Sequence, residues 1–307
     1  MWSHLERGSS PVDWCESNYS ISPMIAEFVN TVSNTNILFF LFPPVLIHLF
    51  QEYAKFFNPA INVLWVLLMI VGLSSAYFHA TLSLYDRGFI IIYCFLIFTL
   101  ALKQQVLISQ LLKKIKSNII SGQLLDELAI LWVFMAAFAM FLPKRYFPKF
   151  LGGNRRLLAF YSSVFSVVST GFLVMHPKAN AFALMTLALP AIGFLCKELN
   201  RVKCARVYRL GLRCVAVCFL AIFSWIIDRM FCDTWLSINF PYMHGVWHIL
   251  IFIASYTALV LFAYFNVSEE RPEQKPQLRY WPRNDFELGV PYITIKHPCK
   301  KDKHLAI

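Results

Sequence analysis

Charged side chains are scarce in this 307-residue chain. Asp, Glu, Lys and Arg make up 15% of it, whereas roughly a quarter of an average soluble domain is charged. Acidic residues are fewer than basic ones, with 17 Asp and Glu against 28 Lys and Arg. Together with 58% hydrophobic residues and a mean hydropathy of +0.56, this scarcity excludes an ordinary soluble domain and favours a membrane protein.

Two familiar sequence patterns are also missing. No cleavable signal pattern precedes the first long apolar run, so we expect that run to serve also as the targeting signal. No inverted repeat or pair of broken apolar segments is evident, which disfavours a transporter. The net charge of +11 is dispersed over connecting segments and tail, which disfavours a nucleic-acid groove.

Seven long apolar runs predict an all-α integral membrane protein, a seven-transmembrane helix bundle. Each run is close to the ~20 residues that a helix needs to cross a bilayer. The runs cover residues near 31–50, 61–78, 124–142, 157–175, 179–196, 210–231 and 246–265. We therefore divide the chain into an N-terminal segment (1–30), a transmembrane domain (31–265) that would hold any catalytic site, and a C-terminal tail (266–307).

The distribution of basic residues predicts the orientation in the membrane. The connections 143–156 and 197–209 are rich in Lys and Arg, whereas the first 30 residues have Arg7 alone against four acidic residues. By the positive-inside rule the two basic connections face the cytosol and the N-terminus faces the lumen. Seven crossings then place the tail in the cytosol, and we interpret it as a solvated basic tail.

Three histidines form a candidate metal site. His244 and His248 stand at positions i and i+4 at the start of the last apolar run, so they share one helical face, and His79 closes the second run. Seven alternating spans place all three at the lumenal end, where they would leave a fourth zinc position open for water. For each residue alone, the alternative is an interfacial histidine that hydrogen-bonds headgroups or backbone. The convergence of three favours a metal.

Two further residues have chemistry that would assist such a site. Ser75 lies four residues before His79 and can donate to an oxygen that gains negative charge, or bond back to the preceding helical turn. Asp126 begins the third run, where it can deprotonate a water molecule or stabilise the helix N-terminus together with Glu127. Asp228 and Arg229 are interpreted as a structural ion pair within the membrane.

The N-terminal segment combines a cysteine with oxygen donors. Cys15 and Cys232 are the clear lumenal pair, and an oxidising compartment would permit a disulfide between them. The side chains of Asp13, Glu16, Asn18 and Glu27 are hard oxygen donors suited to calcium, although their spacing is not that of an EF-hand. A solvated acidic segment is the alternative. Asn18 also begins a glycosylation sequon, and a glycan would exclude metal binding by that side chain.

These segments resemble the alkaline ceramidases along nearly the whole chain. The matching motifs are DWCESNY (13–19), AEF (26–28), YFHATL (77–82), QLLDE (123–127), HxxxH (244–248), RYWPR (279–283) and GVPY (289–292). The resemblance implies a seven-helix membrane amidase that hydrolyses ceramide to sphingosine and a fatty acid.

The same resemblance implies roles for individual residues. His79, His244 and His248 would bind zinc, with Asp126 and Ser75 assisting at the water and the oxyanion. Calcium would be bound by the side chains of Asp13, Glu16, Asn18 and Glu27 and by the backbone carbonyl of Trp14, and Cys15 would pair with Cys232. The implied location is the endoplasmic reticulum membrane, with the Golgi as the alternative. The implied partners are ceramide and the lipid bilayer, without nucleic acid or an obligate protein partner.

One stretch, residues 85–121, departs from the family pattern, which joins Leu84 to Gly122 almost directly. Residues 88–102 are apolar but short for a span, and residues 103–116 are typical of an interfacial amphipathic helix. A crossing here would invert every later span and separate Asp126 from His79. We therefore expect the insert to return to the lumenal face. The alternatives are an inactive isoform and a non-enzymatic seven-helix receptor of the progestin and adipoQ type that keeps a zinc site.

Overall fold

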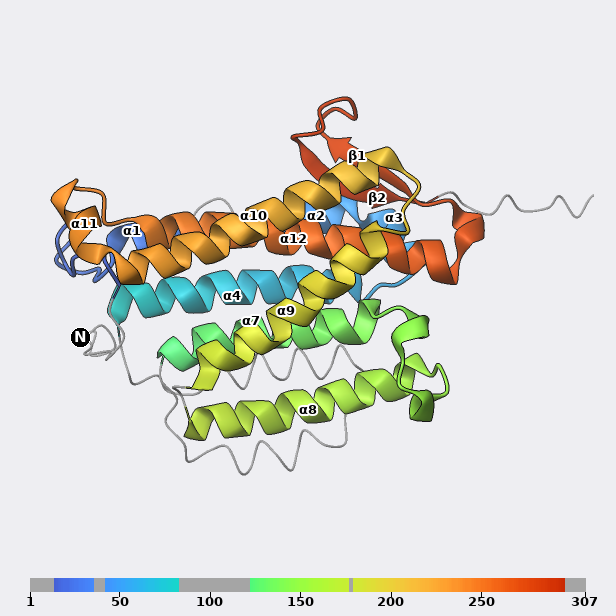
Figure 1. Cartoon of the computed structure of the whole chain (residues 1–307), viewed down its shortest axis with the longest axis horizontal. Helices are drawn as coiled ribbons and strands as arrows, with labels where there is room; N and C mark the ends of the chain where they lie inside the picture. Colours follow the sequence, from blue (N-terminus) through green and yellow to red (C-terminus); the bar gives the residue numbers. More distant parts are fainter. Residues whose placement is uncertain (1–13, 36–41, 83–121, 177–178, 296–307) are drawn as a thin grey trace, which may run out of the picture.

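The computed structural model describes residues 14–35, 42–82, 122–176 and 179–295, and Figure 1 shows them as a bundle of long helices. The long helices are α4 (Ile61–Thr81), α7 (Gly122–Phe141), α8 (Arg155–Met175), α9 (Asn180–Leu199), α10 (Ala205–Met230) and α12 (Met243–Glu270). The short ones are α1 (Phe28–Thr35), α2 (Phe42–Leu49), α3 (Gln51–Phe56) and α11 (Cys232–Ser237), with 3-10 turns η2 (Lys144–Tyr146), η3 (Lys149–Leu151) and η5 (Pro272–Gln274). The prediction of an all-α membrane protein is confirmed.

Five of the described helices are long and apolar enough to cross a membrane. They are α4, α10, α12 and the segments Arg155–Leu173 of α8 and Phe182–Leu199 of α9. The predicted third span corresponds to α7, whose apolar part is Leu128–Phe141. The predicted first span overlaps α1 and contains α2, and residues 36–41 between them lie outside the described part. These two crossings remain predictions.

Successive long helices run in opposite directions, as the colours of Figure 1 show. The end of α4, the start of α7 and the start of α12 therefore lie at one end of the bundle, which we call the histidine end. Residues 83–121 lie outside the described residues, but the helices that flank them end and begin at this same end. The described helices thus keep the alternation that the candidate site requires.

Helix packing separates an interior from a surface suited to lipid. Trp65 of α4 and Phe252 of α12 are fully buried in the main core, where α10 packs along α12 and α4 packs against α7. On the outside, Phe165 and Phe172 of α8 and Phe182 of α9 are more than half exposed. Large exposed apolar surfaces are rare on soluble monomers, and here they match a lipid-facing surface.

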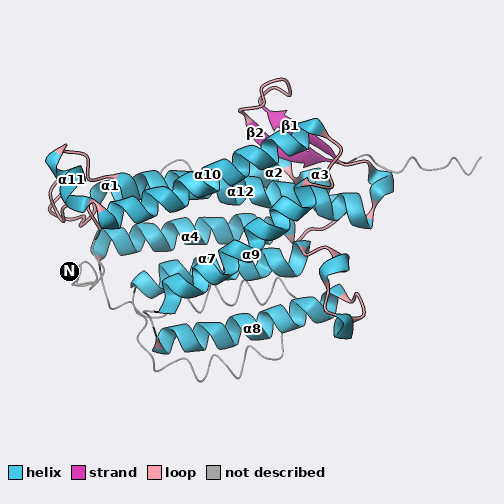
Figure 2. Cartoon of the chain, in the orientation of Figure 1, coloured by secondary structure: helices cyan, strands magenta, loops and turns pink. Residues whose placement is uncertain are grey.

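The C-terminal segment differs from the predicted solvated tail. Helix α12 continues to Glu270, and the chain then forms an antiparallel hairpin of β1 (Gln277–Trp281) and β2 (Val290–Thr294), paired from Gln277↔Thr294 to Trp281↔Val290 (Figure 2). Leu278, Tyr280 and Ile293 are buried, and β2 packs against α2, α3 and α12. The prediction of a solvated tail is therefore wrong over these strands, because every second residue of β1 is buried. Residues 296–307 lie outside the described part.

Basic residues at the end opposite the histidines have specific structural partners. Arg155 donates to the carbonyls of Met140 (2.7 Å) and Leu142 (3.0 Å) and to Glu270 Oε1 (2.7 Å), so it satisfies acceptors where α7 ends. Arg145 donates to Glu198 at 2.8 Å. The basic connections therefore hold helix ends together in addition to their predicted role in orientation.

Candidate metal centre

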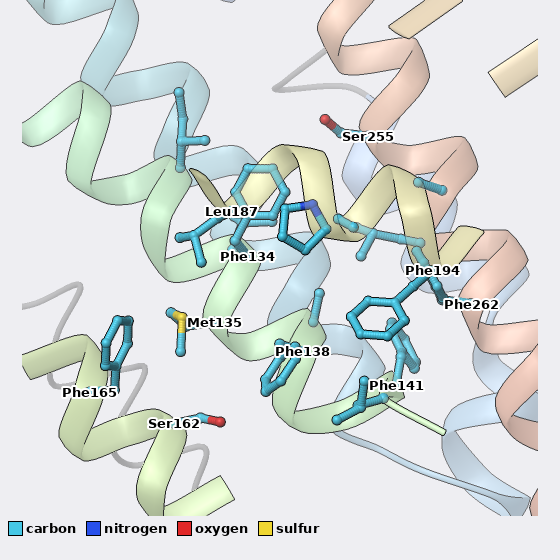
Figure 3. Close-up of a pocket in the computed structure, with 18 of the residues that line it drawn as sticks. Phe134, Met135, Phe138, Phe141, Ser162, Phe165, Leu187, Phe194, Ser255 and Phe262 are labelled. Atoms are coloured by element: carbon cyan, nitrogen blue, oxygen red, sulfur yellow. The ribbon is translucent and has the colours of Figure 1, made fainter. Parts of the chain in front are cut away.

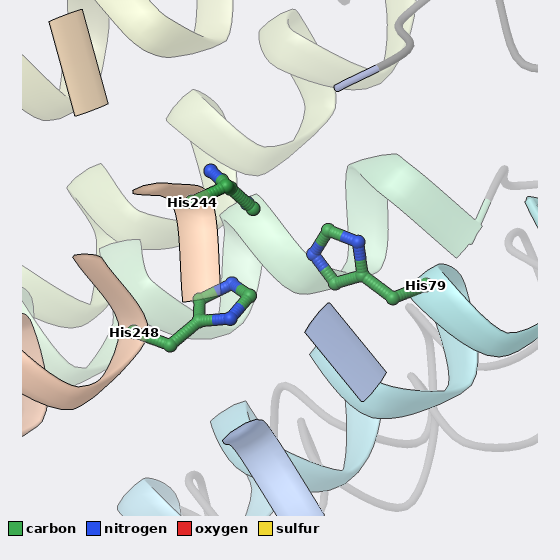
Figure 4. A group of neighbouring side chains, drawn as sticks. All are labelled: His79, His244 and His248. Atoms are coloured by element: carbon green, nitrogen blue, oxygen red, sulfur yellow. The ribbon is translucent and has the colours of Figure 1, made fainter. Parts of the chain in front are cut away.

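The structure brings the three predicted histidines together at the histidine end. His79 lies in the last turn of α4, and His244 and His248 lie in the first two turns of α12. Each ring offers a nitrogen, and these three atoms lie within 4.8 Å of one another. Figure 4 shows the rings around a common space, and all three residues are at most 2% exposed. Three imidazoles in this arrangement can bind one metal ion.

Polar neighbours hold two of the rings and set their tautomers. His79 Nδ1 lies 2.5 Å from Glu27 Oε2 and donates to this carboxylate. His248 Nδ1 lies 2.8 Å from Ser33 Oγ, and the Ser33 hydroxyl donates its one hydrogen to the Asn30 carbonyl at 2.9 Å. Ser33 Oγ must therefore accept from His248 Nδ1. With the protons on Nδ1, the Nε2 atoms present lone pairs, as metal ligands require.

His244 is held differently, between aromatic rings. Its imidazole stacks on Trp14 with ring centroids 3.5 Å apart and on Trp247 at 4.9 Å. Its Nδ1 is buried and has no hydrogen-bond partner among the described residues. A buried polar atom without a partner is costly and needs an explanation. A bound metal would supply one, so the donor set fits a metal centre.

Asp228 connects His244 with the N-terminal segment. One carboxylate oxygen accepts from the His244 backbone N–H at 3.1 Å and the other accepts from the Cys15 N–H at 3.4 Å. A carboxylate at this place also stabilises the N-terminus of α12. The guanidinium of Arg229 lies 4.4 Å from the Trp14 ring centroid and also over Trp225. The predicted Asp228–Arg229 ion pair is therefore wrong, because each side chain interacts with other partners.

Of the two predicted assisting residues, the structure describes the Ser75 side chain but only the backbone of Asp126. Ser75 is 2% exposed and lies one helical turn before His79 on α4. The backbone of Asp126 lies in the second turn of α7, which packs against α4. Helix α7 begins at the histidine end of the bundle, so the Asp126 backbone lies near that end (Figure 1). The Asp126 side chain lies outside the described residues, and its role stays a prediction.

An apolar cavity of about 540 Å³ extends from His248 through the bundle (Figure 3). Ser75 and His248 line it at one end, and Tyr146, Phe150 and Phe262 line it toward the other. Its walls come from α4, α7, α8, α9 and α12 and include the phenylalanines Phe134, Phe138, Phe141, Phe165 and Phe194. Polar lining is sparse, so the cavity suits a hydrocarbon chain.

The family model described as Ceramidase matches residues 6–112 and 117–294. The chain belongs to the ceramidase family. It is similar to an alkaline ceramidase of Drosophila melanogaster, with 52% identity over 97% of this chain and 92% of the relative. Similarity to human alkaline ceramidase 1 is 38% over 94% and 95% of the two chains, and to a Caenorhabditis elegans alkaline ceramidase 27% over 96% of each. The family resemblance found in the motifs is confirmed. The match also includes most of residues 85–121, where the sequence predicted a departure from the family pattern.

This ceramidase-family chain also has the disulfide that its sequence permits. Cys15 and Cys232 are bonded, with Cα atoms 5.3 Å apart and a sequence separation of 217. The bond attaches the segment that contains Trp14 to the start of α11, next to the histidines. It therefore supports the stack of Trp14 on His244.

Two of the candidate calcium ligands, Glu16 and Glu27, lie beside the metal centre. Glu16 and Glu27 are at most 2% exposed. Glu16 accepts from the Val29 and Asn30 N–H groups at 2.7 and 2.9 Å, at the N-terminus of α1. Burial raises the pKa of Glu16 above its ordinary value, and the two backbone hydrogen bonds oppose this increase. Neither carboxylate has a Lys or Arg ion pair in the described residues, so a cation fits here. Asp13 lies outside the described residues.

Sequence reasoning missed the residues that position the rings. Ser33 and Trp14 support His248 and His244 from an N-terminal segment more than 200 residues away in sequence. Glu27 was assigned to calcium alone, yet it also accepts the His79 hydrogen bond. The acidic motif around Glu27 was a usable signal, whereas Ser33 lies in an ordinary apolar run and gave none.

Proposed function

We propose that this chain hydrolyses the amide bond of ceramide, giving sphingosine and a fatty acid, with zinc as its metal. One observation carries the proposal: a buried three-histidine centre borders a long apolar cavity between membrane-spanning helices. Ceramide has an amide close to its polar head and two hydrocarbon chains. Relatives that match almost the whole length of this chain are named alkaline ceramidases, which supports the same activity here.

The dimensions of the cavity are compatible with a long hydrocarbon chain. His248 and Phe262, both in its lining, are 14 residues apart on α12, a distance of ~21 Å at 1.5 Å per residue. This is more than half of the ~30 Å hydrocarbon core of a bilayer. A substrate with its amide at His248 and Ser75 would therefore place one chain along the cavity, where water is excluded.

When bound, zinc would lower the pKa of a coordinated water toward ~7 and polarise the amide carbonyl. His79, His244 and His248 would hold the ion, while Glu27 and Ser33 keep two of these rings oriented. The Ser75 hydroxyl would donate to the carbonyl oxygen as negative charge develops there. Asp126 would take a proton from the attacking water and pass it to the departing sphingosine nitrogen.

We further propose a calcium site formed by Asp13, Glu16, Asn18 and Glu27 with the Trp14 carbonyl. The carboxylates of Glu16 and Glu27 support it, because both are buried and neither has a Lys or Arg ion pair among the described residues. The N-terminal segment would face the lumen and the segment after α12 the cytosol. We place the protein in the endoplasmic reticulum membrane, with the Golgi membrane as the alternative.

The test compares His79→Ala and His248→Ala with His48→Ala, an exposed histidine of α2. Purified proteins are assayed for bound zinc and for sphingosine release from ceramide, with and without a chelator. We expect both centre variants to lose zinc and activity together and His48→Ala to retain them. Full hydrolysis with unchanged zinc in the His248→Ala protein would reject the proposal. Zinc binding without any turnover by the unsubstituted chain would favour an inactive isoform or a non-enzymatic receptor.

A further inference from the structure

The turn of the C-terminal hairpin exposes large apolar side chains. Trp281, Phe286 and Leu288 are 49%, 44% and 77% exposed, although residues of the adjoining strands are buried. Trp281 ends β1, and Phe286 and Leu288 lie in the turn that follows. Three such side chains so close together are unusual for a surface that faces water. The exposed face of the turn therefore needs a covering partner.

Contacts with α10 set the depth of this turn in the membrane. Arg206, Arg209 and Arg213 donate to Glu287, and Arg213 also donates to the Glu287 carbonyl and the Tyr280 hydroxyl. The turn thus lies along the first three turns of α10, as Figure 1 shows for the hairpin.

Helix length indicates that these contacts lie at the membrane boundary. Helix α10 has 26 residues and is ~39 Å long, so it exceeds the ~30 Å hydrocarbon core. Arg213 lies eight residues after Ala205, or ~12 Å along the axis. The helix exceeds the core by ~9 Å, so with all of this excess at the start of α10 Arg213 lies just inside the core. An arginine at this depth needs a partner, and Glu287 supplies the opposite charge.

The apolar surface of the turn continues a lipid-facing stripe on α10. Tyr208, Leu212, Phe219 and Phe223 are 40 to 60% exposed and recur at helical spacing along this helix. Arg279 and Trp281 share the exposed face of β1. Tryptophan and arginine are side chains that favour the boundary between acyl chains and phosphate headgroups.

We propose that the hairpin turn inserts into the leaflet at the end opposite the histidines. Trp281, Phe286 and Leu288 contact lipid acyl chains there, and the exposed Arg279 and Arg283 bind headgroup phosphates. The partner of this surface is the lipid bilayer, and the hairpin anchors the start of α10 at a fixed depth. This assignment does not depend on the reaction at the metal centre.

The experiment places a photoreactive p-benzoylphenylalanine at position 288 of the full-length protein in liposomes that contain anionic phospholipid. The matched control has the same group at position 285, because the Asp285 side chain is 78% exposed in the same turn. After irradiation, mass spectrometry identifies the cross-linked molecule. We expect lipid adducts from position 288 and few or none from position 285.

A second labelling position checks whether the photoreactive group at residue 288 has distorted the turn locally. The photoreactive group at position 286 should give the same lipid adducts, since Phe286 lies on the same turn. No lipid adduct from either 286 or 288 would show that the turn faces water, and the proposal would fail. Cross-links to a protein chain would also overturn it, because they would identify a protein as the covering partner.

Discussion

At the scale of single residues, the metal centre depends on side chains that do not bind metal. Glu27 and Ser33 fix the protons of two imidazoles, and Trp14 and Asp228 hold the third ring and its helix. Outer partners of this kind typically change metal affinity by ~10–100-fold when removed. The centre is therefore sensitive to residues of the N-terminal segment.

Ser33→Ala tests this dependence. The change removes the acceptor for His248 Nδ1–H, so the ring loses its fixed orientation, and we expect metal affinity to fall about tenfold. Competition with a coloured chelator measures the affinity. Ser237→Ala is the control, because this exposed serine donates to the Thr234 carbonyl within its own helical turn. Equal affinities for the two variants would contradict the role given to Ser33.

Gly245, between His244 and His248, permits the close approach of α1. A Cβ atom here would lie 3.2 Å from Val29 Cγ1. Gly245→Ala should therefore displace α1 and destabilise the protein by about 1–3 kcal/mol. At Gly193 on α9 a Cβ would meet nothing within 4 Å, so Gly193→Ala should stabilise its helix slightly. Thermal unfolding in detergent compares the two, and equal midpoints would refute the packing argument.

A site residue was predictable when its partners lie close to it in sequence. The His244–His248 pair is visible because its spacing repeats the helical turn. Asp228 was predicted to form an ion pair with its neighbour Arg229, but it accepts hydrogen bonds from the backbone N–H groups of Cys15 and His244. Such long-range hydrogen bonds leave no local pattern, so they appear only once the helices are packed.

At the scale of elements, apolar runs identified the long helices but not the hairpin. The helices α4, α10 and α12 follow hydrophobic segments of the length that a membrane requires. Strand β1 has only five residues, and its alternation lies within a segment rich in charge. Its burial comes from packing against the bundle rather than from its own hydrophobicity, which is why composition favoured a solvated tail.

Docking of the hairpin should depend on Glu287. Hydrogen bonds from Arg209, with Arg206, lower its pKa from 4.5 to about 2. A lowered pKa in the folded state gives a stabilisation that is complete above pH 4.5 and lost as the pH falls toward 2. Glu287→Gln should therefore lower the thermal midpoint by a constant amount at neutral and alkaline pH. The difference from the unsubstituted protein should shrink in acid, and a difference that grows in acid would contradict this assignment.

The cavity between α7, α8, α9 and α12 should limit substrate length if the proposed reaction is correct. Ser255 lies midway between His248 and Phe262 on α12 and lines the cavity. Ser255→Phe would fill it at half depth, so we expect hydrolysis of long-acyl ceramide to fall by about tenfold or more. Short-acyl ceramide should be hydrolysed as before, which serves as the internal control. Equal losses for both substrates would indicate a general defect instead.

At the scale of the whole molecule, the alternation of helices decides whether the site can form. Sequence reasoning required residues 85–121 to return to the end at which they leave. In the structure α4 ends and α7 begins at the histidine end, so the flanking helices satisfy this requirement. The path of residues 85–121 was not predictable, because their apolar part is short for a span and their basic part is typical of an interfacial helix.

Glycosylation mapping tests this arrangement. Acceptor sequons inserted after Leu82 and before Gly122 should behave alike, because both positions lie at the histidine end. A sequon in the connection between α7 and α8, near Gly152, should behave oppositely. Under the proposed orientation the first two are glycosylated and the third is not. Different results for the two positions that flank the insert would show that the chain crosses the membrane between them.

The metal centre joins the two ends of the chain, as does the disulfide between Cys15 and Cys232, and this has a consequence for biosynthesis. The segment with Trp14, Glu27 and Ser33 is made first, whereas the helix with His244 and His248 is made last. A nascent chain therefore has no complete centre until α12 has left the ribosome. Premature termination anywhere before residue 248 yields a protein without the histidine triad, so this design ties any activity to completed synthesis.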